Sequence, residues 1–262
     1  MISRPAAIAP AFIPPAFITA ALCLAALAAA PAMAADCPRA DTLGTARTLT
    51  VDPASFPRVG TKSFPQTLPL ADKEVVLTFD DGPFPATTNK ILAALAAECV
   101  KATFFLIGRN AQANPQTVRA ILAAGHSIGN HTWSHPNLSR IGQARAVDEI
   151  DRGLAAIEAI PGVPKPIRFF RFPYFASTPA LLTLLEQRHT AVFGADLWAS
   201  DWNPMTPDQQ LHLLVARLEN EGKGIILLHD PKRQTAAMVP AFLLYLKQNG
   251  YRIVHVVPPG QH

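Results

Sequence analysis

Short apolar runs alternate seven times with amphipathic helical patterns between residues 75 and 257, and this alternation restricts the chain to the α/β class. The predicted strands are continuous apolar segments at 75–79, 102–107, 127–130, 167–172, 191–194, 224–228 and 252–257. Strands of this kind, separated by helices, indicate a parallel sheet that is covered by its helices. The count suits a (β/α) barrel with one unit missing, and a doubly wound sheet is the alternative that periodicity leaves open.

Capping signals mark the starts of several predicted helices. Thr87 and Thr88 are candidate caps for the first helix, and Thr206-Pro207 combines a cap with a first-turn proline. Pro240 is expected to bend the last helix, 238–246.

The first 34 residues have the pattern of a secretory signal peptide that is cleaved after Ala34. Arg4 is their only charged side chain, an apolar run follows from Ala16 to Ala30, and Ala32 is the second small residue near the cleavage site. A retained anchor is the alternative, but this run is short against the roughly 20 residues that a membrane span needs. We therefore predict export to the periplasm or the exterior, with no stable membrane insertion after cleavage.

Residues 35–72 are predicted to be a polar leader, interrupted by prolines, that lies over the domain or is partly disordered, and residues 73–262 are predicted to be the domain itself. Cys37 and Cys99 can form one disulfide in an oxidising compartment or remain two free thiols. The net charge of +4 is spread without a run of Lys and Arg, which argues against nucleic-acid binding. The sequence leaves the oligomeric state open.

Polar clusters follow the ends of five predicted strands, the face on which barrel proteins carry their sites. The clusters are TFDDGP at 78–83, NHTWSH at 130–135, RFPY at 171–174, DLWASDW at 196–202 and HD at 229–230. The adjacent carboxylates Asp80 and Asp81 point in different directions, so one can bind a metal while the other acts as a base. A turn with two solvated aspartates is the alternative.

Histidines four residues apart suggest that the second cluster binds a metal. His131 and His135 with one carboxylate make a three-ligand site with an open position, which is typical of catalytic zinc. Arg171 can hold a carboxylate ionised, or it can be a surface arginine beside a buried aromatic residue. A carboxylate next to His229 would raise the pKa of that histidine towards that of a general acid. Trp202 can form the wall of a sugar pocket or belong to the core.

In this order the five clusters resemble the motifs of the polysaccharide deacetylase family, which carries the NodB homology domain and is carbohydrate esterase family 4. The resemblance covers about Glu74 to Val257 and implies a deformed (β/α) barrel of the NodB type with about seven parallel strands. It also implies a divalent metal, usually zinc, with Co²⁺ as another possible ion. The implied ligands are Asp81, His131 and His135.

The resemblance further implies a role for each remaining residue of the clusters. Asp80 would be the general base and Arg171 would orient it. Asp201 would tune His229, the general acid. The implied residues at the oxyanion and the acetyl methyl group are Tyr174 through its backbone N–H, Trp202 and Leu228. His126, Asp196 and Asp230 are expected to support the fold or the site without touching the substrate.

These residues together predict a hydrolase that removes N-acetyl groups from N-acetylglucosamine units of an extracytoplasmic glycan. Peptidoglycan, chitin oligomers and poly-N-acetylglucosamine all carry the reacting amide. An O-acetyl esterase acting on xylan or another glycan is the alternative enzyme. A glycan-binding protein without catalysis is disfavoured because Asp80, His131 and His229 are intact. A cytoplasmic oligosaccharide-modifying enzyme is disfavoured by the predicted signal peptide.

Overall fold

All strand pairs of the sheet are parallel in the computed structural model, which describes residues 1–2 and 41–261. The strands are β1 (Thr45–Thr50), β2 (Arg58–Val59), β3 (Glu74–Asp80), β4 (Thr103–Leu106), β5 (Ser127–Asn130), β6 (Phe169–Phe170), β7 (Ala191–Phe193), β8 (Leu197–Trp198), β9 (Gly224–His229) and β10 (Arg252–Val257). Their order is β1-β10-β3-β4-β5-β6-β7-β2, and β9 pairs with both β3 and β8. All seven predicted strands are therefore present, although β6 is shorter than expected.

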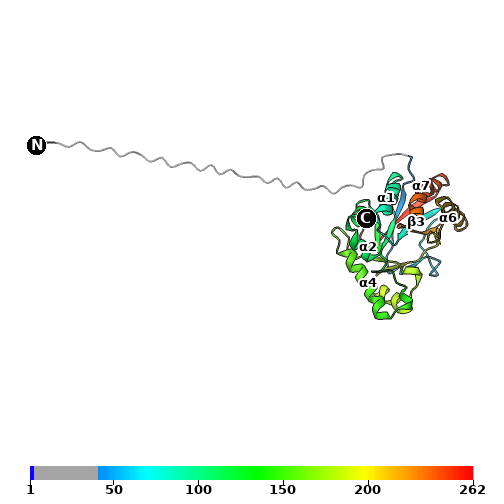
Figure 1. The fold of residues 1–262 in the computed structure, drawn as a ribbon, viewed down its shortest axis with the longest axis horizontal. Helices are drawn as coiled ribbons and strands as arrows, with labels where there is room; N and C mark the ends of the chain where they lie inside the picture. Colours follow the sequence, from blue (N-terminus) through cyan, green and yellow to red (C-terminus); the bar gives the residue numbers. More distant parts are fainter. Residues whose placement is uncertain (3–40, 262) are drawn as a thin grey trace. The chain divides into compact units, whose positions relative to one another are not determined.

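Helices surround this sheet, as Figure 1 shows for the five that it labels. The α-helices are α1 (Pro85–Ala97), α2 (Gly108–Ala113), α3 (Pro115–Ala123), α4 (Gln143–Glu158), α5 (Pro179–Gln187), α6 (Pro207–Glu221) and α7 (Arg233–Gln248). Two short 3₁₀ turns, η1 (Leu138–Arg140) and η2 (Pro173–Phe175), complete the described elements. The α/β class with a parallel sheet is confirmed. The sheet does not close on itself, because no strand pairing joins β7 to β8 within residues 41–261.

The capping predictions have different outcomes. Thr206 caps α6 in a complete capping box with Gln209, as predicted. The prediction for α1 is wrong: the N-cap is Phe84, which makes no side-chain cap, and Thr87 and Thr88 lie inside the helix. The Thr88 hydroxyl instead donates to the buried carboxylate of Asp230.

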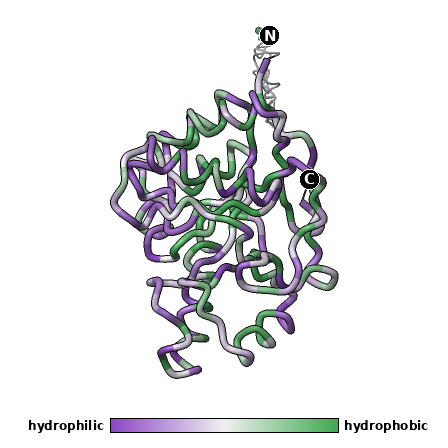
Figure 2. Tube along the Cα trace, turned by 90° about the vertical axis from the view of Figure 1, so that its right-hand side faces the viewer, coloured by the Kyte–Doolittle hydropathy of each residue, from purple (hydrophilic) through white to green (hydrophobic). Residues whose placement is uncertain are grey.

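Alternate residues of the strands face two different cores. Val75, Leu77 and Phe79 of β3 pack with helix side chains in the larger cluster. Val76 belongs to a second cluster, which contains inward-facing residues of β4, β6, β7 and β9. Because side chains alternate along a strand, Thr78 and Asp80 face the same side as Val76. The apolar segments run through the middle of the folded part, and most hydrophilic segments lie at its periphery (Figure 2).

The polar segment before residue 73 contributes to the sheet. Strand β1 pairs with β10 and β2 pairs with β7. Val51, Val59 and Leu70 from this segment are buried in the inner cluster. The folded unit therefore begins before residue 73, and the described part of the predicted leader packs against the rest. The predicted signal peptide and Cys37, with any disulfide it forms, lie outside the described residues.

No helix in the described part of the chain has both the length and the apolar character needed to cross a membrane.

One buried carboxylate holds the early segment to β9. Asp196 accepts hydrogen bonds from the Thr61 N–H at 2.8 Å, the Thr61 hydroxyl at 2.9 Å, the Thr67 hydroxyl at 2.7 Å and the Ile225 N–H at 2.7 Å. The Asp196 side chain and its hydrogen bond with the Ile225 N–H are buried, whereas Thr61 lies at the surface. Asp196 therefore has the supporting role that was expected of it.

We expect Asp196→Ala to lower the free energy of unfolding by about 1–3 kcal/mol, because it leaves the buried Ile225 N–H without an acceptor. Urea denaturation of the variant and the wild type measures the difference. The control is Asp72→Ala, since the side chain of Asp72 is 99% exposed and should contribute little. Equal stability of the two variants would contradict the structural role of Asp196.

Candidate active site

A pocket of about 600 Å³ opens where the strands end, and it collects most of the residues predicted for the site. The lining residues are Asp80, Asp81, His131, His135, Phe172, Tyr174, Phe175, Trp198, Trp202, Leu227, His229 and Lys232. Five segments that are far apart in the sequence contribute side chains to the lining of the pocket. The pocket therefore combines titratable groups at its base with aromatic side chains around them, which is typical of a site for a small ligand.

The turn after β3 directs two adjacent carboxylates differently. Asp80 is the last residue of β3 and is buried, whereas Asp81 has a left-handed backbone with φ of 75°. The side-chain amide of Asn110 donates to the Asp81 carbonyl oxygen at 2.8 Å and fixes this conformation. Glycine is required at position 82, because a Cβ there would come within 2.1 Å of the Asp230 carboxylate. The sequence TFDDGP thus places two carboxylates with different surroundings side by side.

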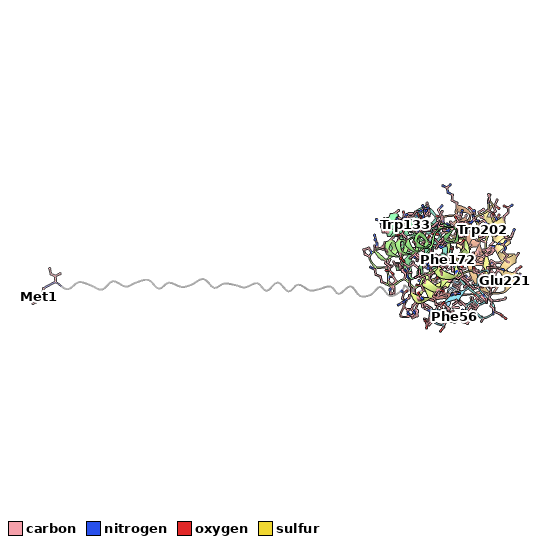
Figure 3. All side chains as sticks on the ribbon, turned by 90° about the horizontal axis from the view of Figure 1, so that it is seen from below. Met1, Phe56, Trp133, Phe172, Trp202 and Glu221 are labelled. Carbon is pink, nitrogen blue, oxygen red and sulfur yellow. The ribbon has the colours of Figure 1, made fainter. Side chains whose placement is uncertain are left out.

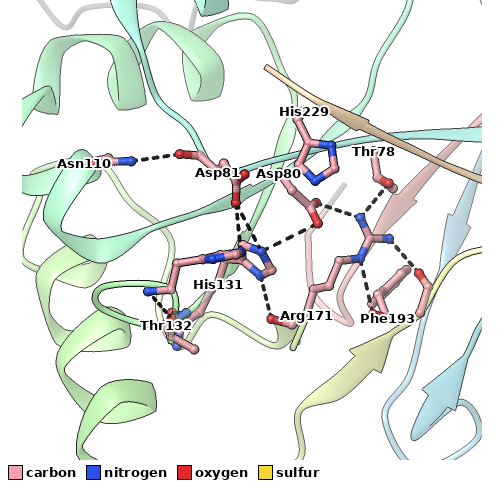
Figure 4. Close-up of polar contacts among 12 residues, drawn as sticks. Thr78, Asp80, Asp81, Asn110, His131, Thr132, Arg171, Phe193 and His229 are labelled. Atoms are coloured by element: carbon pink, nitrogen blue, oxygen red, sulfur yellow. Dashed lines mark hydrogen bonds and ion pairs between the residues drawn. The ribbon is translucent and has the colours of Figure 1, made fainter. Parts of the chain in front are cut away.

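Arg171 holds the first of these carboxylates from inside the sheet (Figure 4). Its guanidinium donates to Asp80 Oδ1 at 2.7 Å and to the Thr78 hydroxyl at 2.8 Å. It also donates to the Gly194 carbonyl at 2.7 Å and lies 4.3 Å from the centroid of the Phe105 ring. Arg171 is completely buried, so its charge is compensated chiefly by Asp80. The alternative of a surface arginine is wrong.

Asp81, His131 and His135 form a compact group of possible metal ligands. Asp81 Oδ1 lies 3.5 Å from His131 Nε2 and 3.2 Å from His135 Nε2, and the three ligand atoms lie within 4.8 Å of one another. A tetrahedral ion with bonds of about 2.0–2.1 Å needs ligand atoms about 3.3 Å apart. Asp81 Oδ1 is buried without a hydrogen-bond donor among the described residues. A buried carboxylate oxygen of this kind is suited to bind a cation.

The protonation states of this group also suit a metal. His131 Nδ1 lies 2.7 Å from the Arg171 carbonyl oxygen, so Nδ1 carries the proton and Nε2 is free to bind. Burial, together with the neighbouring His131, lowers the pKa of His135 to about 4. Burial alone raises the pKa of the Asp81 carboxyl, but the neighbouring histidines His131, His229 and His135 outweigh burial and hold the pKa below its usual range. At neutral pH the group therefore offers one carboxylate and a neutral imidazole of His135.

Helix α4 fixes the loop that carries both histidines. Glu149 accepts hydrogen bonds from the Ser134 N–H and the Ser134 hydroxyl, each at 2.8 Å. Gly153 allows the close approach, because a Cβ there would lie 2.5 Å from both Asn130 Oδ1 and the Thr132 carbonyl carbon. The sequence analysis did not identify Glu149 and Gly153, and a glycine in the middle of an amphipathic helix was the available signal.

His229, the last residue of β9, lines the same pocket, and the buried Asp201 from the segment after β8 holds it. His229 Nδ1 lies 2.7 Å from Asp201 Oδ1, and Asp201 Oδ2 accepts from the His229 N–H at 2.7 Å and the Thr235 hydroxyl at 2.7 Å. Burial by itself lowers the pKa of His229. The hydrogen bond to Asp201 and the charges of Asp201, Asp80 and Asp81 outweigh burial and raise the pKa to about 9. His229 therefore stays protonated at neutral pH.

Aromatic side chains form the walls of the pocket. Tyr174 has a left-handed backbone with φ of 58°, is 67% exposed, and its ring centroid lies 4.8 Å from that of His135. Trp202 is 47% exposed and its ring centroid lies 5.9 Å from that of His229, at an interplanar angle of 88°. Trp198 and Phe175, which the sequence analysis did not assign to the site, stack at 6.1 Å. Figure 3 labels Trp202 towards the edge of the folded part and Phe172 nearer its middle.

One predicted lining residue lies elsewhere. Leu228 does not line the pocket: it is fully buried in the helix-side cluster, and Leu227 takes the place in the wall. His229 faces the pocket, and the alternation of side chains along β9 puts Leu227 on the same side and Leu228 on the other. Counting two residues back from the histidine would have identified Leu227.

The remaining predicted residues support the structure. Asp230 is fully buried, and burial together with the charges of Asp81 and Asp80 raises its pKa to about 7, although the hydrogen bond from Thr88 opposes the increase. His126 accepts a hydrogen bond from the Ala102 N–H at 3.1 Å. Asp230 and His126 are both absent from the lining of the pocket. Neither Asp230 nor His126 is thus in a position to touch a ligand there.

Comparison with known proteins agrees with this arrangement. The family model described as polysaccharide deacetylase matches residues 68–192. A peptidoglycan-N-acetylglucosamine deacetylase from Bacillus cereus is 33% identical over 199 residues, which cover 72% of this chain and 89% of that protein. The peptidoglycan-N-acetylmuramic acid deacetylase of Bacillus subtilis is 35% identical over 193 residues, 73% of this chain and 39% of that protein.

Solved structures show the same similarity. The peptidoglycan deacetylase of Bdellovibrio bacteriovorus matches with a TM-score of 0.75 and 31% identity, over 84% of this chain and 61% of that chain. This chain therefore spans less than two thirds of the Bacillus subtilis and Bdellovibrio proteins.

Proposed function

The chain belongs to the polysaccharide deacetylase family, and from this premise we propose that it is a metal-dependent hydrolase that removes N-acetyl groups from N-acetylglucosamine-type units of an extracytoplasmic glycan. The products are a free amine on the sugar and acetate. Export by the predicted signal peptide places the enzyme where such a glycan is found.

One observation carries the proposal: a base, a metal-binding group and an acid meet in one pocket. Asp80 Oδ2 lies 3.7 Å from His131 Nε2, so the carboxylate is adjacent to the possible metal ligands without belonging to them. His229 lines the same pocket and is held by Asp201. These three functions together meet the difficulties of amide hydrolysis, in which the carbonyl is a poor electrophile and the amine a poor leaving group.

Each residue of the site has a separate role in the reaction. Asp80, oriented by Arg171, takes a proton from the attacking water. The backbone N–H of Tyr174 donates to the oxygen that becomes negative, a contact of a type worth about 3–4 kcal/mol. His229 donates its proton to the departing nitrogen, and Asp201 stabilises the protonated imidazole. Leu227 and Trp202 enclose the acetyl methyl group.

A divalent metal, with zinc as the first choice for two imidazoles and one carboxylate, would be held by Asp81, His131 and His135. When bound, it polarises the acetyl carbonyl and lowers the pKa of water.

Acetate release from a chitin oligomer of about five sugars tests the proposal. We expect release by residues 35–262, loss of release after chelation, and recovery when zinc is added back. Acetylated xylan is the control substrate, because ester cleavage without amide cleavage would favour the O-acetyl esterase. Failure on the oligomer, on peptidoglycan and on poly-N-acetylglucosamine, with metal bound, would refute the proposed function.

We expect Asp201→Asn to move the alkaline limit of activity to lower pH. The general acid must be protonated, so the rate declines as pH increases through the pKa of His229, which is raised to about 9 in the wild type. The substitution keeps a hydrogen-bond acceptor but removes the negative charge that stabilises the protonated ring, and therefore lowers this pKa.

The dependence of kcat/KM on pH from the neutral to the alkaline range measures this shift. Asp208→Asn is the matched control, since Asp208 lies on the surface in the first turn of α6. An unchanged alkaline limit in Asp201→Asn would exclude His229 as the acid that Asp201 controls.

A further inference from the structure

Lys232 is the only lysine or arginine among the described residues that line the pocket, and we infer that its ammonium group binds a carboxylate of the substrate. The site then selects acidic N-acetylated glycans over neutral ones. This inference rests on the proposed function and adds the class of glycan to it.

Lys232 lies on the same wall as the proposed acid. Its N–H donates to the His229 carbonyl oxygen at 3.3 Å, so the lysine follows the histidine within one tight turn. The Trp202 ring packs against His229 on this wall. Gln234 Nε2 donates to the Asp201 carbonyl oxygen at 2.9 Å and ties the start of α7 to the loop of Asp201. The ammonium group is therefore carried by a fixed part of the pocket.

Intramolecular contacts do not account for this charge. Lys62 and Lys247 pair with acidic side chains, whereas Lys232 makes no ion pair with any described carboxylate. Lys232 is also the N-cap of α7, and the first turn of that helix contains no acidic residue. A cation is unfavourable near a helix N-terminus, so helix stability does not explain the lysine. A negatively charged ligand in the pocket does explain it.

The chemistry of the reaction indicates where that negative charge lies. His229 faces the nitrogen on C2 of the reacting sugar, and a substituent on C3 of the same ring is next to that nitrogen. A lactyl ether on C3 carries a carboxylate, and a uronic acid linked to the N-acetylated sugar carries one nearby. A further cation beside the acid favours the binding of such a carboxylate. Lys232 supplies that cation.

The test compares Lys232→Gln with the wild-type protein on four substrates. They are a neutral N-acetylglucosamine pentamer, peptide-free glycan strands of peptidoglycan, the same strands with their carboxylates converted to amides, and hyaluronan oligosaccharides. We expect kcat/KM to decrease about fivefold on at least one acidic substrate, through KM, and to change less than about twofold on the neutral pentamer and the amidated strands. A decrease in kcat/KM on the glycan strands identifies the lactyl carboxylate as the group that Lys232 binds. A decrease on hyaluronan identifies the carboxylate of a uronic acid.

Two further variants complete the test. Lys232→Arg should restore most of the activity on the acidic substrate, because the charge is kept. Lys90→Gln, which removes an exposed charge on α1, should leave all four substrates unchanged. An equal decrease in kcat/KM on neutral and acidic substrates, or no decrease on either, overturns the inference and leaves the proposed function intact. If the wild type releases acetate from none of the four, the proposed function fails and the inference fails with it.

Discussion

Asp80→Asn should lower kcat/KM by about 10²–10⁴-fold while the protein still binds its metal, because the substitution removes a general base and no metal ligand. The asparagine oxygen can still accept the hydrogen bond that Arg171 donates to Asp80 Oδ1 at 2.7 Å, so the buried guanidinium keeps a partner. The amide cannot take a proton from water. The acetate-release assay and the metal content of the purified variant measure the two effects separately.

The separation of these effects is the decisive part of the result. Asp80 lies outside the group formed by Asp81, His131 and His135, and the variant should therefore contain as much metal as the wild type. Activity at the wild-type level in Asp80→Asn would refute the assignment of the base. Loss of metal together with activity would show that Asp80 is a ligand instead.

His131→Ala should abolish both metal binding and activity. It removes one of three ligand atoms and also the hydrogen bond at 2.7 Å between His131 Nδ1 and the Arg171 carbonyl oxygen. Loss of a residue that only supports a ligand already weakens metal binding by about 10–100-fold, and loss of the ligand itself should exceed this. Zinc titration of the metal-free variant measures the affinity, and circular dichroism confirms that the fold is retained.

The control for this variant is His212→Ala. His212 is an exposed histidine of α6 outside the pocket, so its removal should change neither the affinity nor the rate. Wild-type affinity in His131→Ala would exclude the proposed metal site, whatever the activity of the protein.

The sequence alone predicts the strands that carry strong apolar runs and the polar clusters at their ends. It does not predict β1, because four of the six residues in TARTLT are polar and none is fully buried. Only its pairing with β10 defines it as a strand, and that partner lies about 200 residues away in the chain. Local patterns carry no information about such a partner.

The positions within the candidate site show the same limit. Asp80, Asp81, His131, His135 and His229 all line one pocket because each follows a strand of the same parallel sheet. Trp198 lines it from the short strand β8, which its pairing with β9 defines, and Lys232 lines it from the turn after β9. Leu228 was misplaced by one residue, although the alternation along β9 was sufficient to identify Leu227.

The pairing of β1 with β10 also determines when the fold can be completed. A ribosome makes Thr45–Thr50 about 200 residues before Arg252–Val257, and the first strand has its partner only after that interval. The inner cluster needs the same late arrival, because Val254 and Val256 pack there with Val51 and Val59. Until β10 is available, the chain keeps an unpaired strand and an incomplete inner cluster.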